Sequence, residues 1–163
     1  PGTLYLYFKN KDELDASLSL RILQYLLMRL EHVNRTTAEP SQNRIKALRE
    51  AMYDVYEFDP LILLNMFHLQ SSDALKNLTP NLLNEIQNLS KNSLEAMAKL
   101  FESGVKEGVF IDKRPIEIAD ITWAMFSGVV LWETSKKIIG NDDHDLRNTL
   151  DTAFEILARG IAK

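Results

Sequence analysis

Cysteine is absent from the 163 residues of this chain. Its absence excludes disulfide bonds, thiolate metal sites and cysteine nucleophiles. The chain also lacks any apolar run near the roughly 18 uninterrupted residues typical of a membrane-spanning helix, so we expect no membrane segment. No secretory leader is visible, and the expectation is therefore a cytoplasmic location.

Positive charge is also scarce, with 19 Lys and Arg residues against 23 Asp and Glu residues and a net charge of −4. This balance excludes a generally basic nucleic-acid binder. The charge is uneven, because residues 1–35 contain five Lys and Arg against four Asp and Glu, whereas the remainder contains 14 against 19. Any contact with nucleic acid is therefore expected at the start of the chain.

Candidate catalytic groups are few. The chain has three histidines, His32, His68 and His144, and none has a carboxylate or nucleophile at helical spacing that would form a dyad. His68, within NMFHLQ, fits either a core histidine or a polar contact inside a cavity. Residues 142–145 (DDHD) look like a hard-metal cluster, but acidic residues are expected in the first turn of a helix. The sequence predicts no enzyme, no metal site and no cofactor.

Apolar residues recur at helical spacing along nearly the whole chain, and no alternating strand pattern appears. Asn10 and Glu13 have the spacing of a capping box at a helix start. Proline and glycine residues mark most of the other helix ends. The expected helices cover residues 1–8, 10–33, 41–58, 61–70, 80–107, 115–139 and 146 to the C-terminus. The sequence therefore predicts an all-α bundle of about seven helices.

Methionine and aromatic residues are spread over four of these helices. Ordinary core packing and an apolar cavity explain them equally well, because such side chains also form adaptable pocket walls. Few charges accompany them, so a ligand in such a cavity would be hydrophobic or amphipathic. The candidate cavity residues are Tyr53, Tyr56, Met66, Phe67, His68, Met97, Phe101, Trp123 and Phe126.

The helices expected over 115–139 and from residue 146 onward are apolar on an unusually wide face. Gly128 lies within the first of them, where glycine costs about 1 kcal/mol relative to alanine, and a close helix approach would explain it. We favour a two-fold, four-helix interface between two copies of the chain. The alternative is that both faces are buried within one subunit. The candidate interface residues are Ile121, Met125, Gly128, Val129, Trp132, Leu150, Phe154 and Leu157.

The opening GTLYLYFKNKDEL resembles the end of the helix-turn-helix in the TetR family of bacterial transcriptional repressors. The family pattern there is a small residue, Thr, an aliphatic residue, Tyr, a variable position, Tyr or His, an aromatic or aliphatic residue, then Lys-x-Lys and an acidic pair. The matching residues are Gly2, Thr3, Leu4, Tyr5, Tyr7, Phe8, Lys9, Lys11 and Leu14. A second family-like stretch, GVKEGVFIDKRPIEIADITWAMFSGVV, covers residues 104–130.

The resemblance implies a DNA-binding regulator, in the family a repressor, whose operator affinity depends on a ligand in the helical body. Residues 1–14 would be the end of the helix-turn-helix domain, and residues 15–163 the ligand-binding and dimerisation domain. The implied partners are operator DNA, a second copy of the chain and a small-molecule effector. The implied DNA contacts, mainly to phosphates, are Gly2, Thr3, Tyr5, Tyr7 and Lys11.

The family places two further helices ahead of this opening, so we expect operator binding to need a preceding segment. The resemblance also favours a cavity over plain core packing among the middle helices. The alternative is a helical small-molecule-binding or dimerisation module with no role at DNA.

Overall fold

The computed structural model of the protein describes residues 7–36 and 41–163. This part of the chain contains six α-helices and one 3-10 helix, so the predicted all-α fold is confirmed. The elements are α1 (Lys11–Thr36), α2 (Ser41–Phe58), α3 (Pro60–Gln70), η2 (Asp73–Asn77), α4 (Pro80–Lys106), α5 (Pro115–Ile138) and α6 (Leu146–Ile161). The helix expected over residues 1–8 falls mainly outside the described residues, and Tyr7 and Phe8 are not helical.

The start of α1 is capped by the predicted residues. The Asn10 side-chain oxygen accepts a hydrogen bond from the backbone N–H of Glu13 at 2.9 Å. The Glu13 carboxylate accepts one from the N–H of Lys9 at 3.0 Å, and not from Asn10 as a capping box requires. The N-cap at Asn10 is therefore confirmed, but the reciprocal bond of the predicted capping box is replaced by the bond from Lys9 to Glu13.

Glycine ends both α4 and α5 in a left-handed conformation. Gly108 has a φ of +72°, the Val109 N–H donates to the Gly104 carbonyl at 3.0 Å, and the Gly108 N–H donates to Val105 at 3.1 Å. These bonds form a Schellman motif, and Gly140, with a φ of +73°, ends α5 in the same way. The turn after α4 also brings Phe110 back onto that helix, where a Cβ at Gly104 would lie 2.2 Å from the Phe110 ring.

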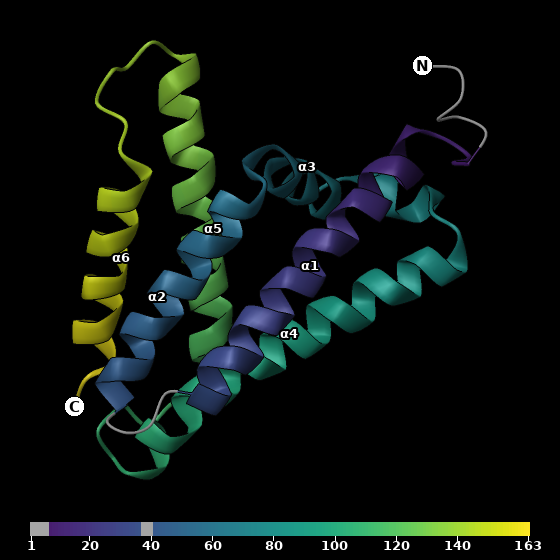
Figure 1. Cartoon of the computed structure of the whole chain (residues 1–163). Coiled ribbons are helices and arrows are strands. Elements are labelled where there is room, and N and C mark those ends of the chain that lie inside the picture. Colours follow the sequence, from purple (N-terminus) through teal and green to yellow (C-terminus); the bar gives the residue numbers. More distant parts are fainter. Residues whose placement is uncertain (1–6, 37–40) are drawn as a thin grey trace.

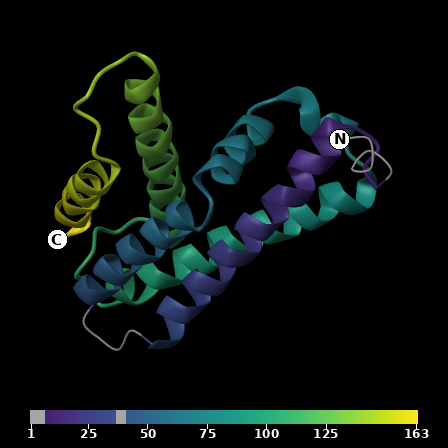
Figure 2. The same cartoon turned by 45° about the horizontal axis from the view of Figure 1, so that its top comes forward.

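The helices form a bundle in which α1 lies along α4, and α5 and α6 form a neighbouring pair (Figure 1). The second view shows the same arrangement, with α2 packed between the α1–α4 pair and α6 (Figure 2). The apolar stripe predicted for α2 faces the core, because Ile45, Leu48, Met52 and Val55 are all buried. The α5–α6 pair therefore lies at one end of the molecule, attached through α2 and α4.

A buried carboxylate on α5 fixes the start of α6. Glu133 is 2% exposed and accepts hydrogen bonds from the Thr149 hydroxyl at 2.7 Å, the Lys136 Nζ at 2.8 Å and the Asp145 N–H at 3.0 Å. Burial raises the pKa of Glu133, but the bonds from Lys136, Thr149 and Asp145 outweigh it, and the net pKa lies below the usual 4.5. Glu133 therefore holds the α5–α6 connection against both helices.

Candidate functional site

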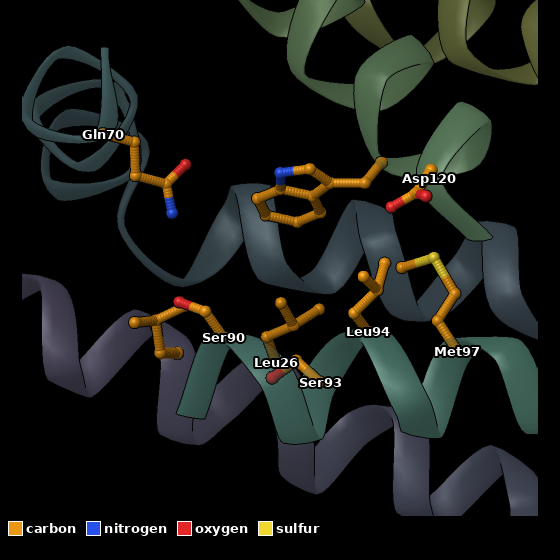
Figure 3. Close-up of a pocket in the computed structure, with 9 residues that line it drawn as sticks. Leu26, Gln70, Ser90, Ser93, Leu94, Met97 and Asp120 are labelled. Atoms are coloured by element: carbon orange, nitrogen blue, oxygen red, sulfur yellow. The ribbon is translucent and has the colours of Figure 1, made fainter. Parts of the chain in front are cut away.

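A cavity of about 170 Å³ opens between α1, α3, α4 and α5. Leucine, methionine and tryptophan form most of its wall, with four polar side chains among them (Figure 3). The lining residues are Leu23, Leu26, Gln70, Ser90, Ser93, Leu94, Met97, Asp120 and Trp123. The cavity thus has an amphipathic wall built by four helices.

Helical spacing explains how each helix contributes its part of the wall. On α4, Ser90, Ser93, Leu94 and Met97 are spaced i, i+3, i+4 and i+7, which places them on one face. Leu23 and Leu26 on α1 are likewise three residues apart, as are Asp120 and Trp123 on α5. The wall is therefore formed by short stripes on regular helices.

The polar side chains of the wall make no hydrogen bond or close ion pair within the described chain, although Asp120 is attracted by the nearby Arg114. Ser93 is 3% exposed, and its hydroxyl oxygen makes no hydrogen bond. Gln70 and Asp120 are exposed at the opposite edges of the opening, and neither side chain has a hydrogen bond or ion pair to another described residue. These groups are free to bind a ligand, which suits a cavity that selects its occupant by polar contacts.

Two of the residues predicted for a cavity line this one, namely Met97 and Trp123. The other predicted aromatic and methionine residues of the middle helices lie in the core behind it. The ring centroid of Trp123 lies 5.8 Å from that of Phe67 and 5.7 Å from that of Phe126. Fully or almost fully buried in this core are Met66, Phe67, Phe101 and Phe126.

The remaining three predicted residues lie elsewhere. His68 is exposed on α3 and is not part of the wall. Tyr53 and Tyr56 line a separate polar cleft of about 340 Å³, beside Lys137 and Arg147. The Arg147 guanidinium lies 4.3 Å from the Tyr53 ring centroid and donates to Glu50 at 2.7 Å and 2.9 Å. This contact joins α6 to α2, away from the apolar cavity.

Seven wall residues were not predicted from the sequence. They are Leu23, Leu26, Gln70, Ser90, Ser93, Leu94 and Asp120. A usable signal was present on α4, because Ser90 and Ser93 interrupt an apolar stripe with small hydroxyl residues. Leu23 and Leu26 lie where α1 becomes apolar on most of its circumference, which marks burial but does not separate packing from a cavity.

The predicted DNA-contacting residues belong to the start of the chain, and two of them are described. Tyr7 is 83% exposed and precedes α1, and Lys11 is exposed in the first turn of that helix. Gly2, Thr3 and Tyr5 lie outside the described residues. The domain boundary predicted at residue 14 falls inside α1, so a single helix connects this end of the chain to the body.

An apolar surface runs along α5. Ile121 and Trp132 are 62% and 57% exposed, and Met125 and Val129 are half-buried. A Cβ at Gly128 would meet no described atom within 4 Å. This exposed side of α5 contains all five of the interface residues predicted on that helix.

The three interface residues predicted on α6 need correction. Leu150, Phe154 and Leu157 are buried in the core of the chain, because the apolar stripe of α6 faces inward. They are therefore core residues and not interface residues. The large apolar side chain that α6 exposes is Ile156, at 67%.

The acidic segment before α6 has a structural role. The Asp145 carboxylate accepts the N–H of Asn148 at 3.0 Å and caps α6. Among the described residues, no group of three or more His, Asp and Glu side chains is placed to hold a metal ion. Among the described helices, α5 alone is long and apolar enough to cross a membrane. Core helices of soluble proteins meet the same two criteria, so this is weak evidence for a membrane span.

No protein-family model matches the chain, and neither does any curated protein. Solved structures do match it. The TetR family transcriptional regulator PfmR from Thermus thermophilus is 18% identical with a TM-score of 0.75, covering 99% of this chain and 82% of that chain. The MbdR regulator from Azoarcus sp. CIB is 18% identical with a TM-score of 0.77, covering 99% and 83%.

The transcriptional regulator FadR from Bacillus subtilis, in complex with stearoyl-CoA, is 19% identical with a TM-score of 0.68, covering 98% of this chain and 81% of that chain. Identities this low establish a shared fold. The chain therefore has the fold of the TetR-family transcriptional regulators.

Proposed function

We propose that this protein is a cytoplasmic, homodimeric TetR-family repressor whose operator affinity is controlled by a small hydrophobic or amphipathic ligand. The observation that carries the proposal is the path of α1. This helix begins at Lys11, beside the exposed Tyr7, and lines the cavity with Leu23 and Leu26. A ligand in the cavity would therefore contact the same helix that leads to the DNA-binding end.

The length of α1 would amplify a small tilt at the cavity into a larger movement at the start of the helix. Leu26 lies fifteen residues after Lys11, which is about 22 Å along a helix at 1.5 Å per residue. A tilt of about 6° at the cavity would move Lys11 by about 2 Å over that length. In a two-fold dimer both heads move, and half-sites must match a groove repeat of about 34–36 Å. A small displacement at the cavity would thus change DNA affinity.

The wall of the cavity supports the type of ligand. Its leucine, methionine and tryptophan side chains suit an apolar body, and its serines, glutamine and aspartate suit a polar end. The similar FadR from Bacillus subtilis is described in complex with stearoyl-CoA, a ligand with an apolar chain and a polar head. The wall of this chain therefore supports a hydrophobic or amphipathic effector.

The dimer would form through the exposed apolar side of α5, centred on Gly128 and Trp132. Light scattering should give about twice the chain mass of 18.7 kDa. Trp132→Glu should shift the protein to a monomer, because it places a charge in the apolar centre of the interface. Lys91→Glu, an exposed change on α4, should leave the dimer intact. A monomeric wild-type protein would refute the dimer.

DNA binding should be tested with the protein expressed from the complete gene and DNA from its own promoter region. The double variant Tyr7→Ala with Lys11→Ala should bind more weakly and show a shallower salt dependence, by about one unit for each lost lysine–phosphate contact. Lys99→Ala, which removes one exposed charge on α4, is the matched control. Unchanged affinity and salt dependence in the double variant would contradict the assigned contacts. A wild-type protein that shifts no DNA would favour the module without a DNA role.

A further inference from the structure

We propose that the cavity between α1, α3, α4 and α5 selects a cationic ligand: a compound with an apolar body about one ring in size and an ammonium group held by Asp120. The inference rests on the proposed function, because it takes this cavity as the effector site. It adds the charge and the size of the effector, neither of which the fold determines.

The size follows from the volume of the cavity. A cavity of about 150 Å³ lined by apolar side chains holds one benzene molecule, and this one measures about 170 Å³. A single ring or a short branched chain would fill it. The apolar part of the wall is formed by Leu23, Leu26, Leu94, Met97 and Trp123.

The charge follows from Asp120. Among the described residues of the wall, Asp120 is the only charged side chain, and no Lys or Arg lies there to bind an anion. The nearby Arg114 forms its ion pair with Glu117 at 2.8 Å and acts on Asp120 only through a longer-range electrostatic attraction, so Asp120 makes no direct ion pair in the described chain. A carboxylate accepts hydrogen bonds only, and an ammonium group is the complementary donor.

The surroundings of Asp120 also suit a cation. Trp123 lies three residues further along α5 and lines the same wall, and the face of an indole ring attracts cations. Gln70 lies at the opposite edge of the opening from Asp120 (Figure 3), where it can bind a second polar group of the ligand but adds no positive charge that would repel a cation. The ammonium group would therefore lie at the opening, with the apolar body inside.

Ser93 is the independent sign that the cavity takes a ligand. Its hydroxyl is buried in the wall without a partner, whereas buried polar groups in folded proteins are almost always hydrogen-bonded. A ligand with a polar substituent on its ring, or an accompanying water molecule, would satisfy this hydroxyl. Ser93 and Asp120 are thus two polar groups in the wall of one largely apolar cavity.

The test compares benzylamine, benzyl alcohol and benzoate, which share a ring and differ in the charge of the polar group. Isothermal titration of the wild-type protein at neutral pH should give the tightest binding for benzylamine and the weakest for benzoate. Asp120→Asn should weaken benzylamine binding by about three- to fivefold, as expected for an exposed ion pair, and leave benzyl alcohol binding unchanged. Asp112→Asn, an exposed carboxylate ahead of α5 that does not line the cavity, is the matched control.

Two further measurements locate the site. Raising the salt concentration should weaken binding of benzylamine and not of benzyl alcohol, because Asp120 is exposed to screening by ions. Leu94→Trp, which fills the cavity from α4, should abolish binding of both compounds, with circular dichroism as the check on folding.

The outcomes separate the two proposals. Benzoate binding as tightly as benzylamine, or an unchanged benzylamine affinity in Asp120→Asn, would overturn the cationic class. Benzyl alcohol binding that Leu94→Trp abolishes would in that case still support an effector cavity. If none of the three compounds binds, both the ligand class and the effector role of this cavity are refuted, whereas the dimer and the DNA contacts are tested separately.

Discussion

Replacing Glu133 with glutamine should destabilise the fold by about 3 kcal/mol. Glu133 is almost fully buried and accepts three hydrogen bonds, from Thr149, Lys136 and the backbone of Asp145. Glutamine has nearly the same shape as glutamate but carries no negative charge. Its amide nitrogen is a donor, and it would face the donors that now bind the Glu133 carboxylate. Lys136 would then lose its counter-ion while its side chain remains only 18% exposed.

The magnitude can be bounded from these contacts. Breaking a buried ion pair by removing one partner costs about 3–5 kcal/mol, and the partial exposure of Lys136 places this case at the lower limit. For a chain of 163 residues, 3 kcal/mol corresponds to a decrease in Tm of about 6–12 °C. Thermal unfolding followed by circular dichroism at one fixed protein concentration measures it, since the proposed dimer would make Tm concentration-dependent.

Glu117→Gln is the matched control, because it makes the same change in an exposed carboxylate on the same helix. The ion pair of Glu117 with Arg114 is exposed on both sides, so water screens it and the same change there should have little effect on stability. If Glu133→Gln unfolds at the wild-type temperature, Glu133 does not fix the α5–α6 connection and the reasoning fails.

The same carboxylate predicts the acid sensitivity of the protein. Burial raises the pKa of Glu133 but its hydrogen bonds lower it by more, and the hydrogen bond from Arg147 lowers the pKa of Glu50. A carboxyl whose pKa is lower in the folded state stabilises it above the unfolded pKa of 4.5, and that stability is lost as the pH falls through the folded value. Wild-type protein should therefore lose more stability below pH 4.5 than Glu133→Gln does.

Three other substitutions have defined outcomes. Gly104→Ala should destabilise the chain by about 1–3 kcal/mol in urea unfolding, because the new Cβ would lie 2.2 Å from the Phe110 ring; wild-type stability would contradict that packing. Gly128→Ala should weaken the dimer in sedimentation experiments if α5 packs closely on a second copy, whereas an unpartnered helix would instead gain about 1 kcal/mol of stability. Arg147→Ala should destabilise the chain by about 1–3 kcal/mol in the same urea assay, because it removes the contacts of Arg147 with Glu50 and with the Tyr53 ring. A loss below about 0.5 kcal/mol would show that these contacts do not hold α6 on α2.

The helices could be predicted because their boundaries are set by local chemistry. Asn10, Asp59 and Asp145 each accept a backbone N–H at a helix start, and Gly108 and Gly140 each end a helix with a positive φ. These interactions involve residues within a few positions of each other, so the sequence contains them in full. The apolar stripes then limit how the helices pack, which made the all-α bundle predictable.

The cavity could be predicted only in part, because spacing reports which face of a helix is apolar and not whether that face meets its neighbour. Met97 lines the cavity, whereas Phe101, one turn later on the same stripe, is fully packed against the core. Asp120 was missed for a related reason. An exposed aspartate on a helix is ordinary by itself, and its place at the opening depends on α3 and α4, which are distant in sequence.

The predicted interface residues lie on the exposed side of α5 but are buried on α6, and one physical reason explains the difference. The inward face of α5 carries Phe126 and Val130, and its outward face carries Ile121 and Trp132, so the helix is apolar on two sides. This two-sided pattern gives α5 the mean hydropathy that would also suit a membrane span. On α6 a single inward stripe contains the apolar residues apart from the exposed Ile156. The wide apolar face that seemed to need a second partner is therefore close to the ordinary amphipathic pattern of a core-facing helix. An excess of apolar surface therefore indicates a partner only when a helix has more of it than one packed face can bury.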